Sequence, residues 1–417
     1  MTEVAPIETL PRWDMSVVYP SLDSPEFAAG MSESLRSIDE LAALFDAEGI
    51  GESRKSAGND APVALFERAL SLLNQTLERF GIDMSYVYGF TSTNSRDELA
   101  QSLQSELRIA GVTLSKLSSR WTAWIGQQDV EGLIANSALA ASHAFALRRE
   151  RTLAEHQMPP GEEALAAELN ASGGSAWAKL HDTITSQIQV PVDIEGTLAV
   201  LPMSEVRNLA LSPHRDVRER AFEAEIGAWR QWATPLAAAM NGIKGEDNTL
   251  AARRGWDDQL DLACFQNHID RATLDAMMGA ARAAFPQFRR YLKAKARLIG
   301  VERLAWFDMF APVGDPGRSW EWLDAVGLLE DRFARFSPGL GALMARAVRE
   351  RWIDAGPRPG KEGGAFCNPL RDDESRILMN FTPSFDSVST LAHEMGHAYH
   401  NVCTAGLTPV QRSVPMT

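Results

Sequence analysis

The stretch T-L-A-H-E-M-G-H-A-Y, from Thr390 to Tyr399, constrains the fold more than any other part of the sequence. It places His393 and His397 four residues apart, with Glu394 directly after the first histidine. Residues four apart lie one above the other on one face of an α-helix. The stretch therefore predicts a helix whose two imidazoles can bind one metal ion.

The residues around the two histidines predict which face of this helix is buried. At about 100° per residue, the apolar side chains fall on the face opposite the histidines. These apolar residues are Val388, Leu391, Met395, Ala398, Tyr399 and Val402. We expect them to anchor the helix in a core, which leaves His393, His397 and His400 facing a cleft or solvent. The alternative interpretation is a pair of ordinary helix histidines that are either buried with satisfied hydrogen bonds or simply solvated.

The H-E-x-x-H pattern is typical of zinc peptidases. In such a site the histidines bind the metal, and zinc lowers the pKa of a bound water to about 7. Glu394 is the candidate general base, since its carboxylate can accept a proton from that water. For 417 residues with 8 His and 55 Asp and Glu, chance gives roughly 0.02 such patterns per chain. The pattern therefore predicts a hydrolytic site with one Zn²⁺ per chain.

Length and composition bound the architecture. The chain has 417 residues, of which 45% are hydrophobic, and it is long enough to fold as two or more domains. We expect an N-terminal helical domain at residues 1–190. Residues 191–417 would then form the N-terminal part of a catalytic domain.

Charge and cysteine content narrow the partners and the location. A formal charge of −14 argues against nucleic-acid binding, which needs a basic face. The sequence contains no apolar run of about 18 residues that would predict a membrane span, and no secretory signal is visible at its start. Three scattered cysteines do not form a disulfide framework, so a reducing cytoplasm is the simplest location.

Most of the chain has the periodicity of α-helices. Helices are expected at 62–80, 97–126, 133–156, 166–180, 237–252 and 273–299, with a strand-like stretch at 187–199. Ser95 and Glu98 predict a capping box at the start of the second of these helices. Residues 365–370 and 376–381 predict a β-hairpin just before the histidine helix. This hairpin either binds a peptide along its edge or only supports the helix.

Six segments carry a resemblance to a known family. They are L-P-R-W-D-M-S-V-V-Y-P-S-L-D (10–23), S-G-G-S-A-W-A-K-L-H-D (172–182), A-A-R-R-G-W (251–256), F-D-M-F-A-P (307–312), K-E-G-G-A-F-C (361–367) and T-L-A-H-E-M-G-H-A-Y-H (390–400). Together they resemble the oligoendopeptidase F branch of the thimet oligopeptidase family of zinc metallopeptidases. The resemblance spans nearly the whole chain, and the metal motif is its most specific part.

The resemblance implies a mainly α-helical ellipsoid that is split by a channel, with a small hairpin or sheet beside the H-E-x-x-H helix. Zinc would lie on the channel floor, bound by His393 and His397, with Glu394 as the general base. In one respect the sequence departs from the family. The resemblance implies a third ligand, a Glu on a following helix, yet no acidic residue follows Glu394. We therefore expect a C-terminally truncated chain that is inactive or impaired by itself.

The resemblance also implies where a substrate binds. Gly364, Ala365 and Phe366 match the strand that lies along the substrate in this family. His400 lies two turns from His393, or roughly 10 Å along the helix axis, too far for both to bind one ion. We therefore expect a substrate-facing role for His400.

The leading functional prediction is a zinc-dependent endopeptidase that hydrolyses internal bonds of short oligopeptides. Short peptides are its expected partners, and neither nucleic acid nor a membrane is expected; the oligomeric state is not predicted. A metallocarboxypeptidase of a related helical fold is one alternative, and cleavage of a C-terminally amidated peptide would exclude it. A non-catalytic peptide-binding scaffold is the other.

Overall fold

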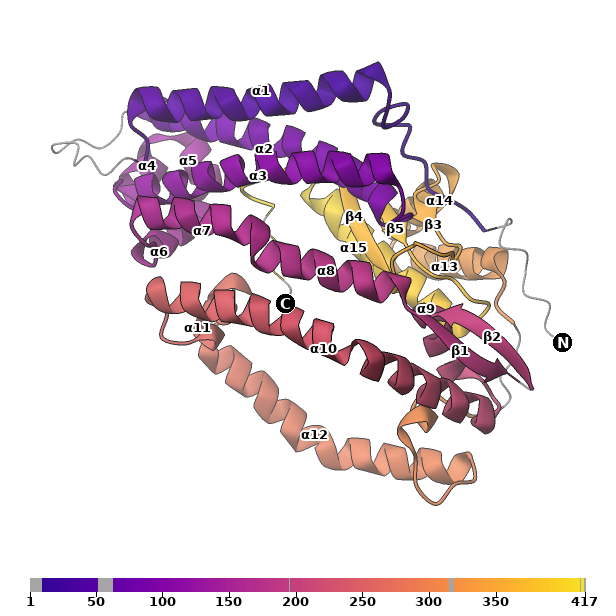
Figure 1. Cartoon of the computed structure of the whole chain (residues 1–417). Coiled ribbons are helices and arrows are strands. Elements are labelled where there is room, and N and C mark those ends of the chain that lie inside the picture. The colour runs from indigo at the N-terminus through magenta and orange to yellow at the C-terminus, as the bar shows by residue number, and fades with distance from the viewer. Residues whose placement is uncertain (1–9, 52–62, 195, 315–318, 413, 416–417) are drawn as a thin grey trace.

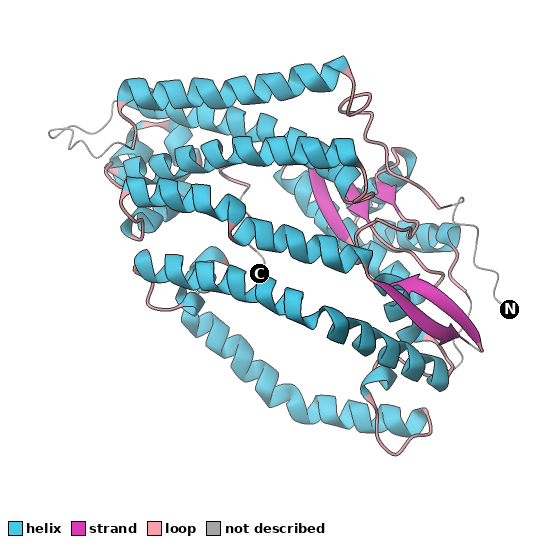
Figure 2. Cartoon of the chain, viewed as in Figure 1, coloured by secondary structure: helices cyan, strands magenta, loops and turns pink. Residues whose placement is uncertain are grey.

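A computed structural model of the chain describes residues 10–51, 63–194, 196–314, 319–412 and 414–415. The described part is mainly α-helical and has a two-stranded and a three-stranded sheet (Figure 2). The predicted fold class, mainly α with a small sheet beside the histidine helix, is confirmed. No described helix combines the length and the apolar character that a membrane span requires.

Three long helices form one side of the molecule (Figure 1). They are α1 (Pro25–Glu48), α2 (Val63–Thr91) and α3 (Glu98–Ile125), and their shared core includes Leu41, Phe45, Phe66 and Trp121. Three short helices follow: α4 (Val130–Asn136), α5 (Ala138–Ser142) and α6 (Ala144–Glu155). The helix predicted at 133–156 is therefore divided in two places.

The predicted capping box at the start of α3 is wrong. The N-cap is Asp97, whose carboxylate accepts a hydrogen bond from the Ala100 N–H at 3.0 Å. The Ser95 hydroxyl is buried and has no hydrogen-bond partner in the described residues. Since both Asp and Ser are good N-caps, the local pattern could not decide between two candidates that are two residues apart.

A helical pair and a hairpin connect the two halves of the chain. These elements are α7 (Pro160–Ser172), α8 (Gly174–Gln187), the antiparallel strands β1 (Gln189–Ile194) and β2 (Thr197–Pro202), α9 (Met203–Asn208) and the 3₁₀ turn η2 (Leu209–Leu211). The stretch expected as one strand at 187–199 is thus a hairpin. The predicted domain boundary at 190 falls inside β1, and the division into two domains stays a prediction.

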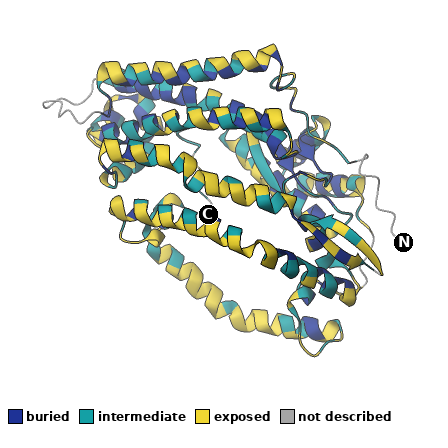
Figure 3. Ribbon diagram, in the orientation of Figure 1, coloured by how far each residue is buried: buried dark blue, intermediate teal, exposed yellow. Residues whose placement is uncertain are grey.

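Two long helices form the opposite side (Figure 1). Helix α10 (Arg215–Arg253) passes through Pro235 and packs along α8. The expected helix at 237–252 is therefore only its second half. The short α11 (Gln259–Gln266) leads to α12 (Arg271–Leu298), which contains Pro286. Figure 3 shows that most of α12 is exposed.

The remaining elements build the platform for the histidine helix. They are η3 (Trp306–Asp308), α13 (Trp322–Phe336), α14 (Pro338–Arg349), β3 (Ile353–Asp354), β4 (Phe366–Arg371), β5 (Glu374–Leu378) and α15 (Phe385–Thr404). The strand order is β3-β5-β4, with β3 parallel and β4 antiparallel to β5. The predicted hairpin is confirmed, although its second strand begins at Glu374 rather than at 376.

Candidate active site

Helix α15 is anchored by its apolar face. Its N-cap is Ser384, whose hydroxyl accepts a hydrogen bond from the Ser387 N–H at 3.3 Å. The face that packs on the sheet and on α13 and α14 consists of Val388, Leu391, Met395 and Ala398, each at most 2% exposed. His393, His397 and His400 are exposed. The burial of this helix follows the predicted periodicity.

The imidazoles of His393 and His397 converge. Their Nε2 atoms lie 3.2 Å apart, and their rings stand nearly perpendicular, at 85°. Two ligands of one tetrahedral zinc, each about 2.0–2.1 Å from the metal, have nitrogens about 3.3–3.4 Å apart. The pair therefore fits two positions of a zinc site. No group of three or more His, Cys, Asp or Glu suited to a metal gathers in the described part of the chain.

Glu394 lies beside this pair but points into the protein. It is 5% exposed, and its Oε2 has no hydrogen-bond partner among the described residues. Burial raises the pKa of its carboxyl, and the charges of His393 and His397 oppose that shift. A buried carboxylate oxygen without a partner costs free energy in the folded state. The position is therefore suited to a group that exchanges protons rather than one that supports the fold.

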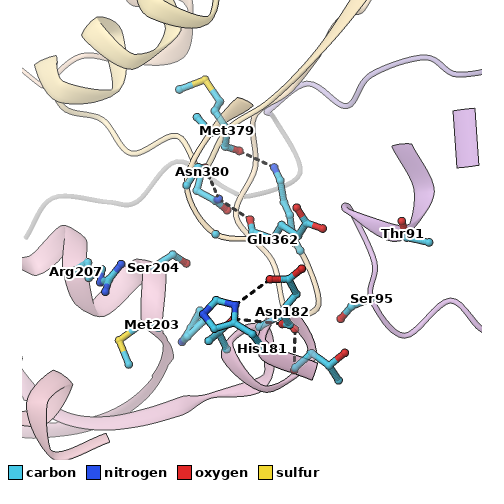
Figure 4. Close-up of a pocket in the computed structure, with 18 of the residues that line it drawn as sticks. Thr91, Ser95, His181, Asp182, Met203, Ser204, Arg207, Glu362, Met379 and Asn380 are labelled. Carbon is cyan, nitrogen blue, oxygen red and sulfur yellow. Dashed lines mark hydrogen bonds and ion pairs between the residues drawn. The ribbon is translucent and has the colours of Figure 1, made fainter. Parts of the chain in front are cut away.

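A cavity of about 1120 Å³ lies next to the first turns of α15. Its walls come from α2, α3, α8, α9, the loop at 361–365 and the N-terminal half of α15, as the close-up in Figure 4 shows in part. The α15 residues that line it are Asp386, Ser387 and Thr390. Because Thr390 lies one turn before His393, the cavity ends close to the histidine pair.

The loop before β4 forms one wall of this cavity. Gly363, Gly364 and Ala365 line it, and Gly364 has φ of 82°, which favours glycine. The Asn380 side-chain amide donates to the carbonyls of Glu362 and Gly364, both at 3.0 Å, and so fixes the loop.

Phe366 begins β4, and its ring stacks on that of Tyr88 from α2, with centroids 5.3 Å apart. The buried Lys361 donates to the Asp354 carboxylate and to the Met379 carbonyl, both at 2.6 Å. Burial lowers the pKa of Lys361 to about 8, and Asp354 opposes the shift.

The structure brings most of the predicted site residues to one region. The histidine pair and Glu394 share α15. Gly364 and Ala365 line the neighbouring cavity, and Phe366 packs on Tyr88, which also lines it. His400 is exposed on the same helix and is not among the residues that line the cavity. Tyr88 and Glu362 were not among the site residues predicted from the sequence. The only local sign that Glu362 belongs to a site is its position directly before Gly363 in the K-E-G-G-A-F-C segment. Nothing in the sequence near Tyr88 indicates a site.

Two family profiles match separate parts of the chain. Peptidase family M3 matches residues 342–416, which contain the sheet and α15, and Oligopeptidase F matches residues 124–189. Among curated proteins, an oligoendopeptidase F homolog from Lactococcus lactis subsp. lactis is 22% identical over 410 residues. That match covers 94% of this chain and 64% of the relative. The oligopeptidase PepF of Bacillus subtilis is also 22% identical, over 83% of this chain and 52% of the relative. The chain thus spans less than two thirds of either relative.

Solved structures show the same fold. A PZ peptidase A determined with an inhibitor superposes with a TM-score of 0.69 at 15% identity, over 92% of this chain and 64% of that one. The oligoendopeptidase-F of Enterococcus faecium gives a TM-score of 0.56 at 16% identity, over 77% of this chain and 66% of that one.

The mainly α-helical fold is similar to that of these solved structures, and the segment that carries the H-E-x-x-H helix and the three-stranded sheet matches the M3 profile. The two family profiles, the relatives and the solved structures together support the oligoendopeptidase F branch of peptidase family M3.

Proposed function

We propose that this protein is a zinc-dependent endopeptidase that hydrolyses internal bonds of short oligopeptides. One observation carries the proposal: two histidine nitrogens lie 3.2 Å apart beside a buried carboxylate oxygen that has no partner in the described residues. The printed names of the relatives, oligoendopeptidase F and oligopeptidase PepF, support the oligopeptide substrate class.

His393 and His397 would hold the zinc ion, one per chain. When bound, zinc polarises the scissile carbonyl and lowers the pKa of water at the site. Catalytic zinc sites normally use three protein ligands. The described residues gather only these two, so we expect them to hold zinc weakly and the activity of this chain alone to be impaired.

Glu394 would move the proton. Its carboxylate takes a proton from the attacking water as the water oxygen forms a bond to the carbonyl carbon. Glu394 then delivers that proton to the amide nitrogen as the carbon–nitrogen bond breaks. A pKa raised by burial favours both steps, since it makes the carboxylate a stronger base and its protonated form easier to retain until the amine leaves.

The peptide would lie along β4. Because β4 is at the edge of the described sheet, it has unpaired backbone groups that can pair with an extended peptide. Gly364 and Ala365 precede this strand and line the cavity, and Phe366 begins the strand. Backbone pairing of this kind can bind peptides of many different sequences, which agrees with oligopeptides as substrates. His400 would contact the part of the substrate beyond the histidine pair.

Replacing Glu394 by Gln tests the role of the carboxylate. Glu394→Gln keeps the side-chain volume but cannot accept the proton, so we expect turnover of a quenched fluorescent peptide to fall about 10²–10⁴-fold. Bound zinc, measured by elemental analysis, should be unchanged, whereas His393→Ala should lose it. Undiminished turnover in Glu394→Gln would exclude the assigned role.

The nature of the cleaved bond can be tested separately. Cleavage of a C-terminally amidated peptide favours the endopeptidase over a carboxypeptidase. Peptide binding that needs neither turnover nor metal would favour the scaffold alternative. A cytoplasmic location is part of the proposal and is supported by Cys264, Cys367 and Cys403, none of which is in a disulfide.

A further inference from the structure

Glu362 is held rigidly in the wall of the large cavity. Its backbone N–H donates to the Ser92 carbonyl at 2.8 Å, and its own carbonyl accepts from Asn380 at 3.0 Å. Its carboxylate Oε2 accepts a hydrogen bond from the Tyr88 hydroxyl at 2.8 Å. The backbone of Glu362 is therefore fixed by Ser92 and Asn380, and its side chain by Tyr88 of α2.

The second carboxylate oxygen of Glu362 is open. The side chain is half-buried and lines the cavity, yet among the described residues Oε1 has no hydrogen-bond partner and is not sealed from solvent. A fixed carboxylate with one oxygen held by a phenol and the other facing a cavity can accept a charge-assisted hydrogen bond from a ligand.

The cations near Glu362 do not neutralise it. Lys361, the next residue in the chain, points the other way and donates to Asp354 and Met379. Arg207, which also lines the cavity, is paired with Glu225 at 2.8 Å. In the part of the chain that the structure describes, neither Arg108 nor Lys179, which line other parts of the cavity, is within ion-pairing distance of Glu362.

The charged neighbour that does affect Glu362 is another carboxylate. Asp182 lies on α8, where its Oδ1 is 3.0 Å from the His181 Nδ1, and Figure 4 shows it on a neighbouring wall of the cavity. Burial raises the pKa of the Glu362 carboxyl, the Tyr88 hydroxyl lowers it, and Asp182 raises it again. The charged side chain that acts on Glu362 is therefore another acid, and no ion pair joins Glu362 to a cation within the described residues.

We propose that Glu362 determines specificity by binding a positively charged group of the peptide, an ammonium or a guanidinium. This inference rests on the proposed peptidase function. Glu362 lies two residues before Gly364, so a peptide paired along residues 364–366 and β4 runs past the carboxylate. The Tyr88 and Phe366 rings form an apolar surface beside it, which would carry the aliphatic part of a Lys or Arg side chain. The charge can come from the N-terminus of the peptide or from such a side chain.

A matched peptide set tests the proposal on the full chain. The peptides share one neutral quenched fluorescent core and differ in having a free or acetylated N-terminus, and Lys or Gln at each position in turn. Wild-type protein should favour the best cationic peptide over its neutral partner by about tenfold in kcat/KM. Glu362→Gln keeps an acceptor for Tyr88 but removes the charge, and should abolish that preference, so that kcat/KM becomes equal for the cationic and the neutral peptide.

A control variant and a binding measurement make the outcome decisive. Glu106 is an exposed acid on α3 outside the cavity, so Glu106→Gln should retain the preference. Fluorescence anisotropy of labelled cationic and neutral peptides measures the same charge preference as a difference in affinity, without the need for turnover. If acetylation of the peptide removes the preference, Glu362 binds the N-terminal ammonium. If the preference depends instead on Lys at one position, Glu362 binds that side chain.

Two results would count against different claims. A tenfold preference that persists in Glu362→Gln, or cleavage and binding with no charge preference in wild type, overturns this inference while leaving the peptidase proposal intact. Suppose instead that no peptide is cleaved but the higher affinity for cationic peptides is lost in Glu362→Gln. The endopeptidase proposal for this chain then fails, and the proposal that Glu362 binds a cationic group is supported.

Discussion

Asp308 and Glu394 are both carboxylates removed from solvent, at 0% and 5% exposure, yet their surroundings differ. Asp308 accepts hydrogen bonds from Arg218 at 2.9 Å and from the Ala305 N–H at 3.0 Å. Glu394 has an oxygen with no partner in the described residues. Burial acts to raise the pKa of both, but Arg218 and Ala305 hold that of Asp308 below its usual value, whereas the pKa of Glu394 is raised.

The difference separates a carboxylate that supports the fold from one that is available for chemistry. Arg218 lies near the start of α10, and Asp308 ends η3, so their ion pair joins the two elements. Lys295 of α12 donates to the adjacent Met309 carbonyl at 2.7 Å, which ties a third element to the same corner. Within the described ranges no comparable set of contacts fixes Glu394, and its burial is tolerated because the apolar face of α15 anchors the helix.

Breaking the Asp308 ion pair should have the largest effect on stability. Arg218→Met removes the closest cation from a buried carboxylate, which keeps Arg215 and the Ala305 N–H, and we expect a loss of about 3 kcal/mol in the free energy of unfolding. Urea denaturation at neutral pH measures it. Arg253→Met, which breaks the exposed pair with Glu162, should cost less than about 1 kcal/mol. Equal losses in the two variants would contradict the comparison.

The pH dependence of stability sharpens the same contrast. Because the folded-state pKa of Asp308 is lowered, its contribution is present above the unfolded value of about 3.9 and is lost as pH falls through the folded value. Asp308→Asn should therefore cost about 2 kcal/mol at pH 7, and the gap from wild type should shrink below about pH 4. Urea midpoints measured at both pH values test this, and a gap that stays constant with pH would refute it.

The smallest effect is expected at Glu394, with the opposite sign. Glu394→Gln removes a buried charge whose oxygen lacks a described partner, so metal-free protein should gain about 1 kcal/mol of stability. Urea denaturation after chelation measures it, with the exposed substitution Glu106→Gln as a control that should change stability by less than about 0.5 kcal/mol. A loss of stability in Glu394→Gln would show that the carboxylate supports the fold after all.

The parts of the molecule that the sequence predicts well are those encoded locally. The burial of α15 follows from the spacing of Leu391, Met395 and Ala398, and the β4–β5 hairpin follows from two short apolar runs around a charged turn. The metal and base roles of His393, His397 and Glu394 were predicted from spacing alone. They remain predictions, supported by the convergence of the two imidazoles.

The parts that were missed depend on distant contacts. Tyr88 and Glu362 meet across 274 positions in the chain, and nothing near either residue predicts the other. The sequence predicted a helix at 237–252, yet α10 begins at Arg215 and continues through Pro235, and it packs against α8, β1 and α9. The choice of Asp97 over Ser95 as an N-cap likewise depended on how the helix was placed, rather than on the local pattern.

The position of β4 at the edge of the sheet bears on how this protein avoids self-association. An open edge that can receive a peptide can also receive the same edge of another copy and so begin aggregation. Pro369 lies in β4, is exposed and has no N–H, and the pairing with β5 shifts register directly after it. An incoming strand can therefore pair with the first residues of β4 but finds the row of donors interrupted. The same edge that admits a short peptide is in this way a poor template for a growing fibril.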